Sequence, residues 1–320
     1  MKNEYLYTQQ LSHNGEDLEL DLLKSATLTL KVNALAPFLI LRILNPHNFL
    51  LEDIGLKKFD ELKIRFMDYY DEDDKGELMT VIVLDFHPDK NPNIMVIECL
   101  EESAYWLSQK DYKIFSRKPI ASILGALVPK LQIECGQFQT NNTYHLPNRR
   151  RFELLARMAK ENGAVFFISR GKLVFKTKED LFKQADIANY EYWNKSARYE
   201  IAQPRLIDHE FVNEEQKRNY IGWHIERGLI KSTVATGYPP KMHCCDTVGK
   251  LNNITKRLTP VVTFRSKGEG TMTIGSPIKL TWHSGIADRP IDESYPDRVL
   301  LGEVEHHEQK DFRTTITGVI

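Results

Sequence analysis

Apolar and polar residues alternate along much of the first third of the chain. Between residues 26 and 32 every second residue is apolar, which is the period of a β-strand with one buried face. The same period recurs at 62–66, and the segment 78–84 is apolar on both faces, as expected for a strand that is covered on both sides. We therefore predict that the N-terminal third is built from strands.

An acidic run, residues 68–76, separates two of these predicted strands. Counting from Asp71 places Gly76 at the sixth position of an EF-hand loop. Lys75, however, takes a ligand position, and Ile82 stands where the bidentate glutamate belongs. A solvated hairpin loop is therefore favoured over a calcium site.

The middle of the chain changes to a helical period. Apolar residues at 120, 123, 124 and 127 share one face of a helix that we predict near 117–129, with Ser116 as its cap and Pro119 in its first turn. A second helix is predicted at 148–162, between an Asn148 cap and Gly163 as a left-handed C-cap. A hairpin over 164–176, turning at Arg170 and Gly171, follows it.

The second predicted helix has one apolar and one cationic face. We expect an inward face made of Phe152, Leu155, Met158 and Ala159, and an outward face made of Arg149, Arg150, Arg151, Arg157 and Lys160. The arginine run at 149–151 is interpreted first as a solvated helix start and second as a contact to an acidic neighbouring subunit. Nucleic acid is the least favoured partner, because the run lacks interleaved aromatic residues.

The last third returns to β patterns. Short β-prone runs lie at 206–212 and 261–264, and 278–282 alternates between apolar and polar residues. A strand pair then closes the sequence, with strands at 299–306 and 312–320 on either side of a polar turn.

Composition narrows the function classes. The 43 basic and 44 acidic residues nearly cancel, so no global positive field attracts nucleic acid. Four unevenly spaced cysteines do not form a disulfide framework, which predicts reduced thiols and a cytoplasmic origin. The N-terminus lacks a signal-peptide pattern, and the densest apolar run, 38–44, is too short to span a membrane, so no membrane anchor is expected.

Several groups of residues resemble functional sites. The sequence His243, Cys244, Cys245 and Asp246 gathers metal-ligand types, but neighbours in a strand point to opposite faces and structural zinc sites need spaced pairs, so a packed loop is favoured. His306 and His307 should likewise face opposite ways. The segment 270–276 imitates a phosphate loop without its lysine. We therefore predict no catalytic, cofactor-binding or metal residues.

Four segments resemble one known family in their order and spacing. They are Lys113 to Phe115 before the first helix, Phe152 to Gly163 within the second, Leu301 to His306, and Phe312 to Thr317. The family is the baseplate hub proteins of contractile phage tails, which share their fold with the hub part of type VI secretion VgrG spike proteins. Where many relatives carry acidic residues before the second helix, this chain has Pro147 to Arg151, so a neighbour contact there would change sign.

The resemblance implies a mainly β, α+β fold with three domains. Residues 1–104 and 201–320 would each form a tube-like small β-barrel, and 105–200 an inserted α/β domain. The resemblance further implies a virion protein of the tail baseplate that is not an enzyme and that assembles in the host cytoplasm. It would form a homotrimer with pseudo-sixfold symmetry around a DNA channel. Its implied partners are the tail tube protein, a separate spike protein, the tape-measure protein and baseplate wedge proteins, with DNA only in transit.

Two other classes remain as alternatives. One is a tail-tip hydrolase, for which His243 and Cys244 would be the first residues to mutate. The other is an adaptor of two β-domains that stays monomeric in solution.

Overall fold

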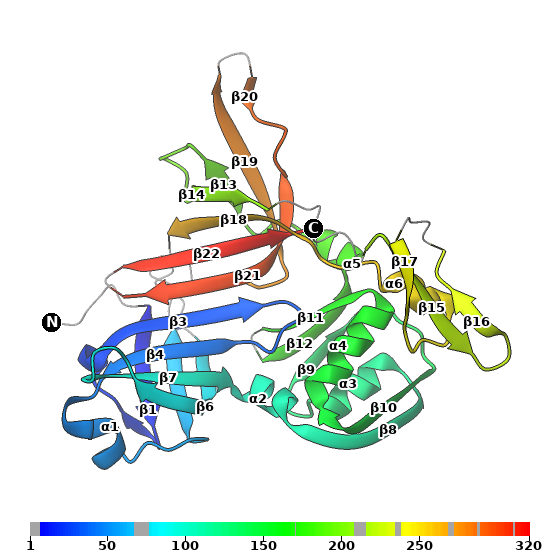
Figure 1. Cartoon of the computed structure of the whole chain (residues 1–320). Coiled ribbons are helices and arrows are strands. Elements are labelled where there is room, and N and C mark those ends of the chain that lie inside the picture. Colours follow the sequence, from blue (N-terminus) through cyan, green and yellow to red (C-terminus); the bar gives the residue numbers. More distant parts are fainter. Residues whose placement is uncertain are drawn as a thin grey trace.

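Two strands from opposite ends of the chain lie side by side and join its two halves (Figure 1). Strand β3 (Leu23–Lys31) pairs antiparallel with β21 (Arg298–Glu308), in a register that sets Lys31 opposite Glu303 and Ala26 opposite Glu308. Through this pair, the N-terminal and C-terminal strands form one continuous 14-stranded sheet.

This computed structural model describes residues 7–66, 77–169, 171–207, 216–233, 238–267, 272–286, 289–309 and 311–320. The acidic run at 68–76, with its choice between a hairpin loop and a calcium site, therefore lies outside the described residues. So do Arg170 of the predicted hairpin turn and parts of the segments 206–212 and 270–276.

The N-terminal module is a curved sheet in the order β2-β1-β5-β6-β7-β4-β3, with a short helix α1 (Phe49–Glu52) beside it. Its strands besides β3 are β1 (Thr8–His13), β2 (Glu16–Asp17), β4 (Phe38–Leu44), β5 (Glu61–Phe66), β6 (Glu77–Pro88) and β7 (Ile94–Glu101). The alternation at 26–32 and 62–66 corresponds to β3 and β5, and one shared apolar core contains side chains from β1, β3, β4, β5, β6 and β7.

The C-terminal module is a closed six-stranded barrel. Its strands follow the order β21-β22-β18-β14-β13-β19, and β19 pairs back onto β21. The strands besides β21 are β13 (Asn189–Tyr192), β14 (Tyr199–Leu206), β18 (Pro260–Lys267), β19 (Pro277–Ile286) and β22 (Phe312–Val319), and β20 (Arg289–Ile291) extends β19 as a hairpin. The strands predicted at 299–306 and 312–320 are thus confirmed as β21 and β22.

The mainly β character of the chain is confirmed, together with one closed barrel. Within the described residues no backbone pairing joins β1 to β3, so the N-terminal module forms a curved sheet, and a second closed barrel stays a prediction. The domain boundaries after residues 104 and 200 stay predictions.

An α/β module lies between the two β modules in the sequence. Its helices are α2 (Glu102–Ser108), α3 (Ile120–Leu127), α4 (Arg151–Asn162) and α5 (Lys178–Phe182). Its strands are β8 (Lys110–Lys118), β9 (Gln132–Cys135), β10 (Asn142–Arg150), β11 (Ala164–Ser169) and β12 (Lys172–Thr177). β8 pairs with β10, while β11, β12 and β9 form a second sheet, and the apolar faces of α3 and α4 share one core with both.

Two capping predictions in this module are wrong. Helix α3 is preceded by Pro119 as N-cap, and Ser116 lies in β8. Asn148 lies in β10 at a positive φ of 51°, beside a register shift, and α4 begins only at Arg151. The pairing of β10 with β8 extends this strand to the helix, because a backbone ladder satisfies more polar groups than a single side-chain cap. Gly163, in contrast, ends α4 in the left-handed conformation as predicted, with a φ of 60°.

The cationic face of α4 is also different from its prediction. Arg151 is buried, with 9 % of its surface exposed, because its guanidinium pairs with Asp111 at 3.0 Å and lies 4.2 Å from the centre of the Trp106 ring. Arg149 and Arg150 remain exposed, and Arg149, at the end of β10, pairs with Glu153 in the first turn of α4. The arginine run is therefore divided between the interior and the surface.

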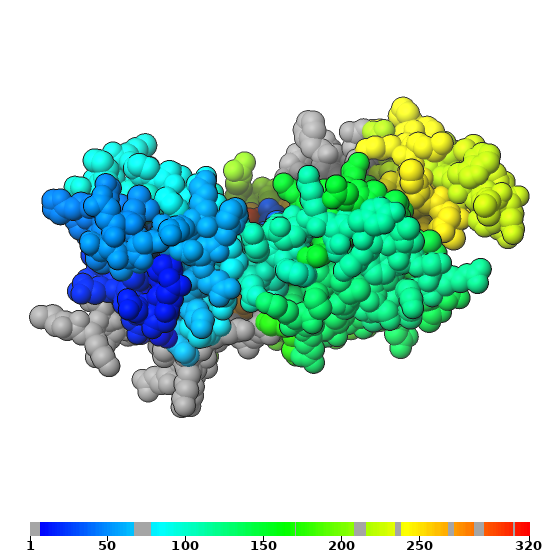
Figure 2. Space-filling view, turned by 90° about the horizontal axis from the view of Figure 1, so that it is seen from below, coloured from blue at the N-terminus to red at the C-terminus, as the bar shows by residue number. Residues whose placement is uncertain are grey.

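A small sheet that the sequence did not predict is inserted between β14 and β18. We call residues 218–254 the insert: it contains β15 (Arg218–His224), β16 (Gly228–Lys231), β17 (Tyr238–Met242) and helix α6 (Val248–Asn253). Figure 2 shows it beside the α/β module, at the opposite end of the molecule from the N-terminal module. None of the helices among the described residues combines the length and the apolar character needed to cross a bilayer.

Candidate functional site

The C-terminal end of α4 faces the insert and carries a buried carboxylate. Leu154, Leu155, Met158 and Ala159 fix the helix by packing into the core, which turns Glu161 toward the insert. The Glu161 side chain is 1 % exposed, and its Oε1 accepts a hydrogen bond of 2.8 Å from Arg157 Nε one turn earlier. Asn253 of α6 donates to the Glu161 backbone oxygen at 3.2 Å, so the helix end and the insert are directly connected.

The segment 243–245 follows β17 and is held against β15 by backbone hydrogen bonds. His243 N donates to Ile221 O at 2.8 Å, and Trp223 N donates to Cys245 O at 3.1 Å. Between these two bonds lies Gly222, where a Cβ atom would approach Cys245 O to 2.5 Å. Only glycine allows the two segments to lie so close, and this closeness fixes where the side chains of His243 and Cys245 point.

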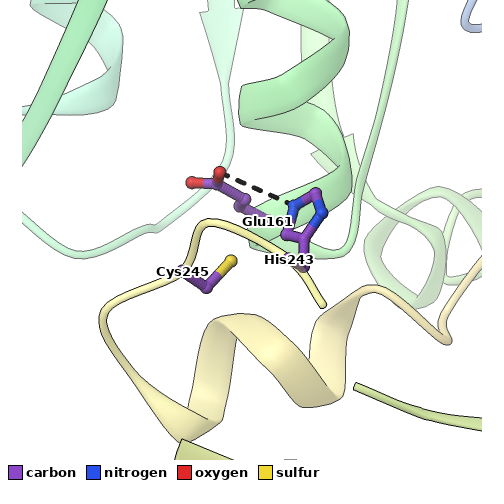
Figure 3. A group of neighbouring side chains, drawn as sticks. All are labelled: Glu161, His243 and Cys245. Atoms are coloured by element: carbon purple, nitrogen blue, oxygen red, sulfur yellow. Dashed lines mark ion pairs between the residues drawn. The ribbon is translucent and has the colours of Figure 1, made fainter. Parts of the chain in front are cut away.

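These elements bring Glu161, His243 and Cys245 together (Figure 3). One ligand-type atom of each residue lies within 4.8 Å of the others, and His243 Nε2 is 3.9 Å from Glu161 Oε1. A pocket of about 340 Å³ adjoins the three side chains, lined also by Arg157, Trp223 and Lys250. His243 Nε2 is buried and has no hydrogen-bond partner among the described residues.

The pKa values of the side chains around the pocket are shifted by burial and by neighbouring charged groups. Burial, and then the negative charge of Glu161, raise the pKa of the Cys245 thiol to about 12. Burial, and then the positive charge of Lys160, lower the pKa of His243, which favours the neutral imidazole. Burial opposes the ionisation of Asp246, but the hydrogen bond from Lys250 at 2.9 Å, the positive charge of Lys250 and smaller favourable contacts together lower the pKa of the Asp246 carboxyl.

Successive side chains along 243–246 point to opposite sides, as expected, but this alternation leaves two possible metal ligands on the same side. Cys244 is exposed, and Asp246 is exposed and pairs with Lys250, whereas His243 and Cys245 both face α4. The third residue of the cluster, Glu161, was not predicted from the sequence. It lies 82 residues before His243 in a helix, and a glutamate in the last turn of an amphipathic helix carries no local signal of burial.

The consecutive histidines of β21 also separate as predicted. His306 is 1 % exposed, and its Nδ1 lies 3.0 Å from Thr314 Oγ1. His307 is half-buried on the other face, where its Nδ1 lies 2.9 Å from Thr27 Oγ1.

The outer face of the insert is apolar. Trp223 pairs across strands with Leu229, and Ile221 pairs with Met242, so their side chains lie on one side of the sheet. Trp223, Leu229 and Met242 are each more than 60 % exposed. Adjacent large apolar side chains with this exposure are typical of a protein interaction surface.

Comparison with solved structures identifies the architecture. A tail protein from Neisseria meningitidis and the 43 kDa tail protein of prophage MuSo2 from Shewanella oneidensis both superimpose with a TM-score of 0.63 at 12 % identity. The match covers 97 % of this chain in both cases, and 95 % and 97 % of the two tail proteins. This chain has the fold of phage tail proteins.

The tail-protein fold extends to a secretion system. A component of the type VI secretion system of E. coli, itself described as similar to the T4 bacteriophage tail proteins gp27 and gp5, matches 98 % of this chain with a TM-score of 0.55 at 9 % identity. The resemblance to tail hub and VgrG proteins seen in the sequence is thereby confirmed at the level of the fold. No protein-family model and no curated protein sequence matches the chain.

Proposed function

We propose that the protein is a structural baseplate hub of a contractile phage tail or a related injection machine. The main support for this proposal is the extent of the structural match. Nearly the whole of this chain superimposes on nearly the whole of two tail proteins. A shared barrel alone would be weak support, since small barrels serve many functions, but a match over the full length of both chains is more specific.

In the proposed assembly three copies form a ring. The curved N-terminal sheet and the C-terminal barrel would act as two near-equivalent tube-like modules, corresponding to residues 1–104 and 201–320, with 105–200 as the inserted domain. Each module contributes seven strands to the 14-stranded sheet and has its own apolar core. Three copies would then present six similar modules to a hexameric tail tube and true threefold symmetry to a trimeric spike.

The proposed partners are the tail tube protein on one side and a separate spike protein on the other, with the tape-measure protein and wedge proteins as further contacts. The exposed apolar face of the insert supports a role in assembly, because such a face is normally covered in the working complex. A formal net charge of −1 suits a channel through which DNA passes without being retained.

A tail-tip hydrolase is the less favoured alternative. From the sequence, its nucleophile would be Cys244 beside His243, but Cys244 is exposed, and the residue that lies with His243 and Glu161 is the buried Cys245. A thiol whose pKa is raised to about 12 is protonated at neutral pH, whereas a catalytic cysteine needs a depressed pKa.

Light scattering of the purified chain, alone and with its tube and spike proteins, tests the proposal. Assembly should give a species of three chains, about 111 kDa from 3 × 37.1 kDa, plus any bound partner. A chain that stays at 37.1 kDa in the presence of both partners would instead support a monomeric adaptor. Turnover of cell-wall peptidoglycan by that monomer would support the hydrolase.

A further inference from the structure

We propose that Glu161, His243 and Cys245 form a binding site for a divalent transition-metal ion of the zinc class. The ion would connect the end of α4 to the insert. Such a site would lie within a single chain and would form whether or not the chain assembles into a ring.

The donor set has the chemistry that such an ion selects. Zinc accepts a cysteine thiolate, an imidazole nitrogen and a carboxylate oxygen as ligands from proteins. The Cys245 thiol would release its proton to solvent as the ion binds, because metal coordination deprotonates a thiol. Zn–S bonds of about 2.3 Å and Zn–N or Zn–O bonds of about 2.0 Å separate tetrahedral ligands by roughly 3.3–3.6 Å. The donor atoms here lie within 4.8 Å of one another, so side-chain rotations that move them by about 1 Å complete the geometry.

The site is held in place by its backbone. Hydrogen bonds from His243 N to Ile221 O and from Trp223 N to Cys245 O attach both insert ligands to β15, and the close approach at Gly222 leaves the segment little room to shift. The third ligand lies on the rigid helix α4, 1 % exposed. Ligands carried on paired strands and a helix need little reorganisation on binding.

Two observations at the site point to a missing partner. His243 Nε2 is buried and makes no hydrogen bond to the described residues, although a buried ring nitrogen without a partner is costly. The pocket beside the cluster, about 340 Å³, leaves room for a water molecule at the fourth coordination position. Arg157 would remain as a hydrogen-bond donor to the Glu161 carboxylate, as is common around ligating carboxylates.

The insert has a structural need for such a connection. Among the described residues of the insert, the buried core consists of five, Tyr220, Ile230, Cys245, Leu251 and Ile254. A core of this size contributes little stability by itself, and small units of this kind are commonly stabilised by a bound metal. A metal at Cys245 would link that core directly to α4.

The test uses the full chain, stripped with a chelator and then titrated with Zn²⁺ and, as a spectroscopic probe, Co²⁺. We expect one ion per chain by elemental analysis, a higher melting temperature with Zn²⁺, and a thiolate-to-cobalt charge-transfer absorption with Co²⁺. Cys245→Ser should abolish that absorption, and His243→Gln and Glu161→Gln should each weaken Zn²⁺ binding at least tenfold. The neighbouring Cys244→Ser is the matched control and should bind like the unmodified chain.

A second measurement needs no variant and so avoids any failure to fold. Zn²⁺ should slow the alkylation of Cys245 at least tenfold in denaturant concentrations that loosen the insert, without changing that of Cys244. Absence of a bound ion in the unmodified chain, an equal loss of the cobalt absorption in Cys244→Ser, or equal protection of the two cysteines would overturn the proposal.

Discussion

Glu308, near the C-terminus, accepts two hydrogen bonds from Thr8, near the N-terminus, at distances of 2.6 Å from the hydroxyl and 3.1 Å from the backbone nitrogen. Both residues are buried, with 3 % and 0 % of their surfaces exposed. Since β21 is paired with β3, this contact brings β1 back toward the strand at the other edge of its module. A single carboxylate therefore helps the N-terminal sheet to curve around its core.

Removing the Thr8 hydroxyl should destabilise the chain measurably. Thr8→Ala takes away the shorter of the two hydrogen bonds and leaves a buried carboxylate with less compensation, which costs about 1–3 kcal/mol of the free energy of unfolding. Urea denaturation followed by circular dichroism gives the value. Thr29→Ala, at a half-buried position on β3, is the control and should cost less than half as much. Equal losses would show that the Thr8 contact has no special role.

Burial of His306 should make the chain less stable in mild acid. Burial lowers its pKa from about 6.5 to about 4, so between these values the unfolded chain binds a proton that the folded chain does not. The free energy of unfolding should therefore fall as the pH drops from about 6.5 to about 4, by up to roughly 3 kcal/mol from this residue.

The His306 contribution is isolated by comparison with His306→Gln at each pH. Burial also raises the pKa of the nearby Glu308, and a raised carboxyl pKa changes the free energy of unfolding with pH in the opposite direction. Glu308 is present in both proteins, so its effect cancels when their free energies of unfolding are subtracted. Urea midpoints between pH 4 and pH 7 provide the measurement. Parallel curves for the two proteins would contradict the prediction.

Arg151 should matter far more than its neighbour Arg150. Arg151→Ala removes the ion pair with Asp111 and the contact over Trp106, leaving a partly buried carboxylate without its arginine, and should cost about 2–3 kcal/mol. Arg150→Ala changes an exposed side chain and should stay within about 0.5 kcal/mol. Chemical denaturation of both variants tests the division of the arginine run into buried and surface parts. Similar losses of stability in the two variants would contradict the burial of Arg151.

Two glycines of the insert should respond in opposite directions to the same substitution. Gly222→Ala places a Cβ atom 2.5 Å from Cys245 O and should destabilise the insert by about 1–3 kcal/mol, because backbone must move to relieve the clash. Gly249→Ala lies in α6 with open space around it and should stabilise by about 0.5–1 kcal/mol through helix propensity. Hydrogen exchange of residues 218–254 measures both effects locally. Destabilisation by Gly249→Ala, or tolerance of Gly222→Ala, would contradict the described packing.

Local pattern was sufficient for many of the elements. Alternation placed strands at 26–32, 299–306 and 312–320, and the helical period placed the core faces of α3 and α4. The same patterns failed at helix starts, where Asn148 resembles a cap but belongs to a strand. The competition there is between a side-chain cap and a backbone ladder with β8, and the ladder involves residues some 30 positions away.

The sequence by itself determined which segments have a buried apolar face and whether that face follows the period of a strand or of a helix. This depends only on residues that are close together along the chain. It also contained enough ordered motifs to indicate the tail-protein architecture. The tertiary structure alone decided that β3 lies beside β21, because strand pairing uses backbone groups that every residue shares. It alone brought Glu161 to His243 and Cys245, because the meeting of a helix end with a distant loop depends on the packing of everything between them.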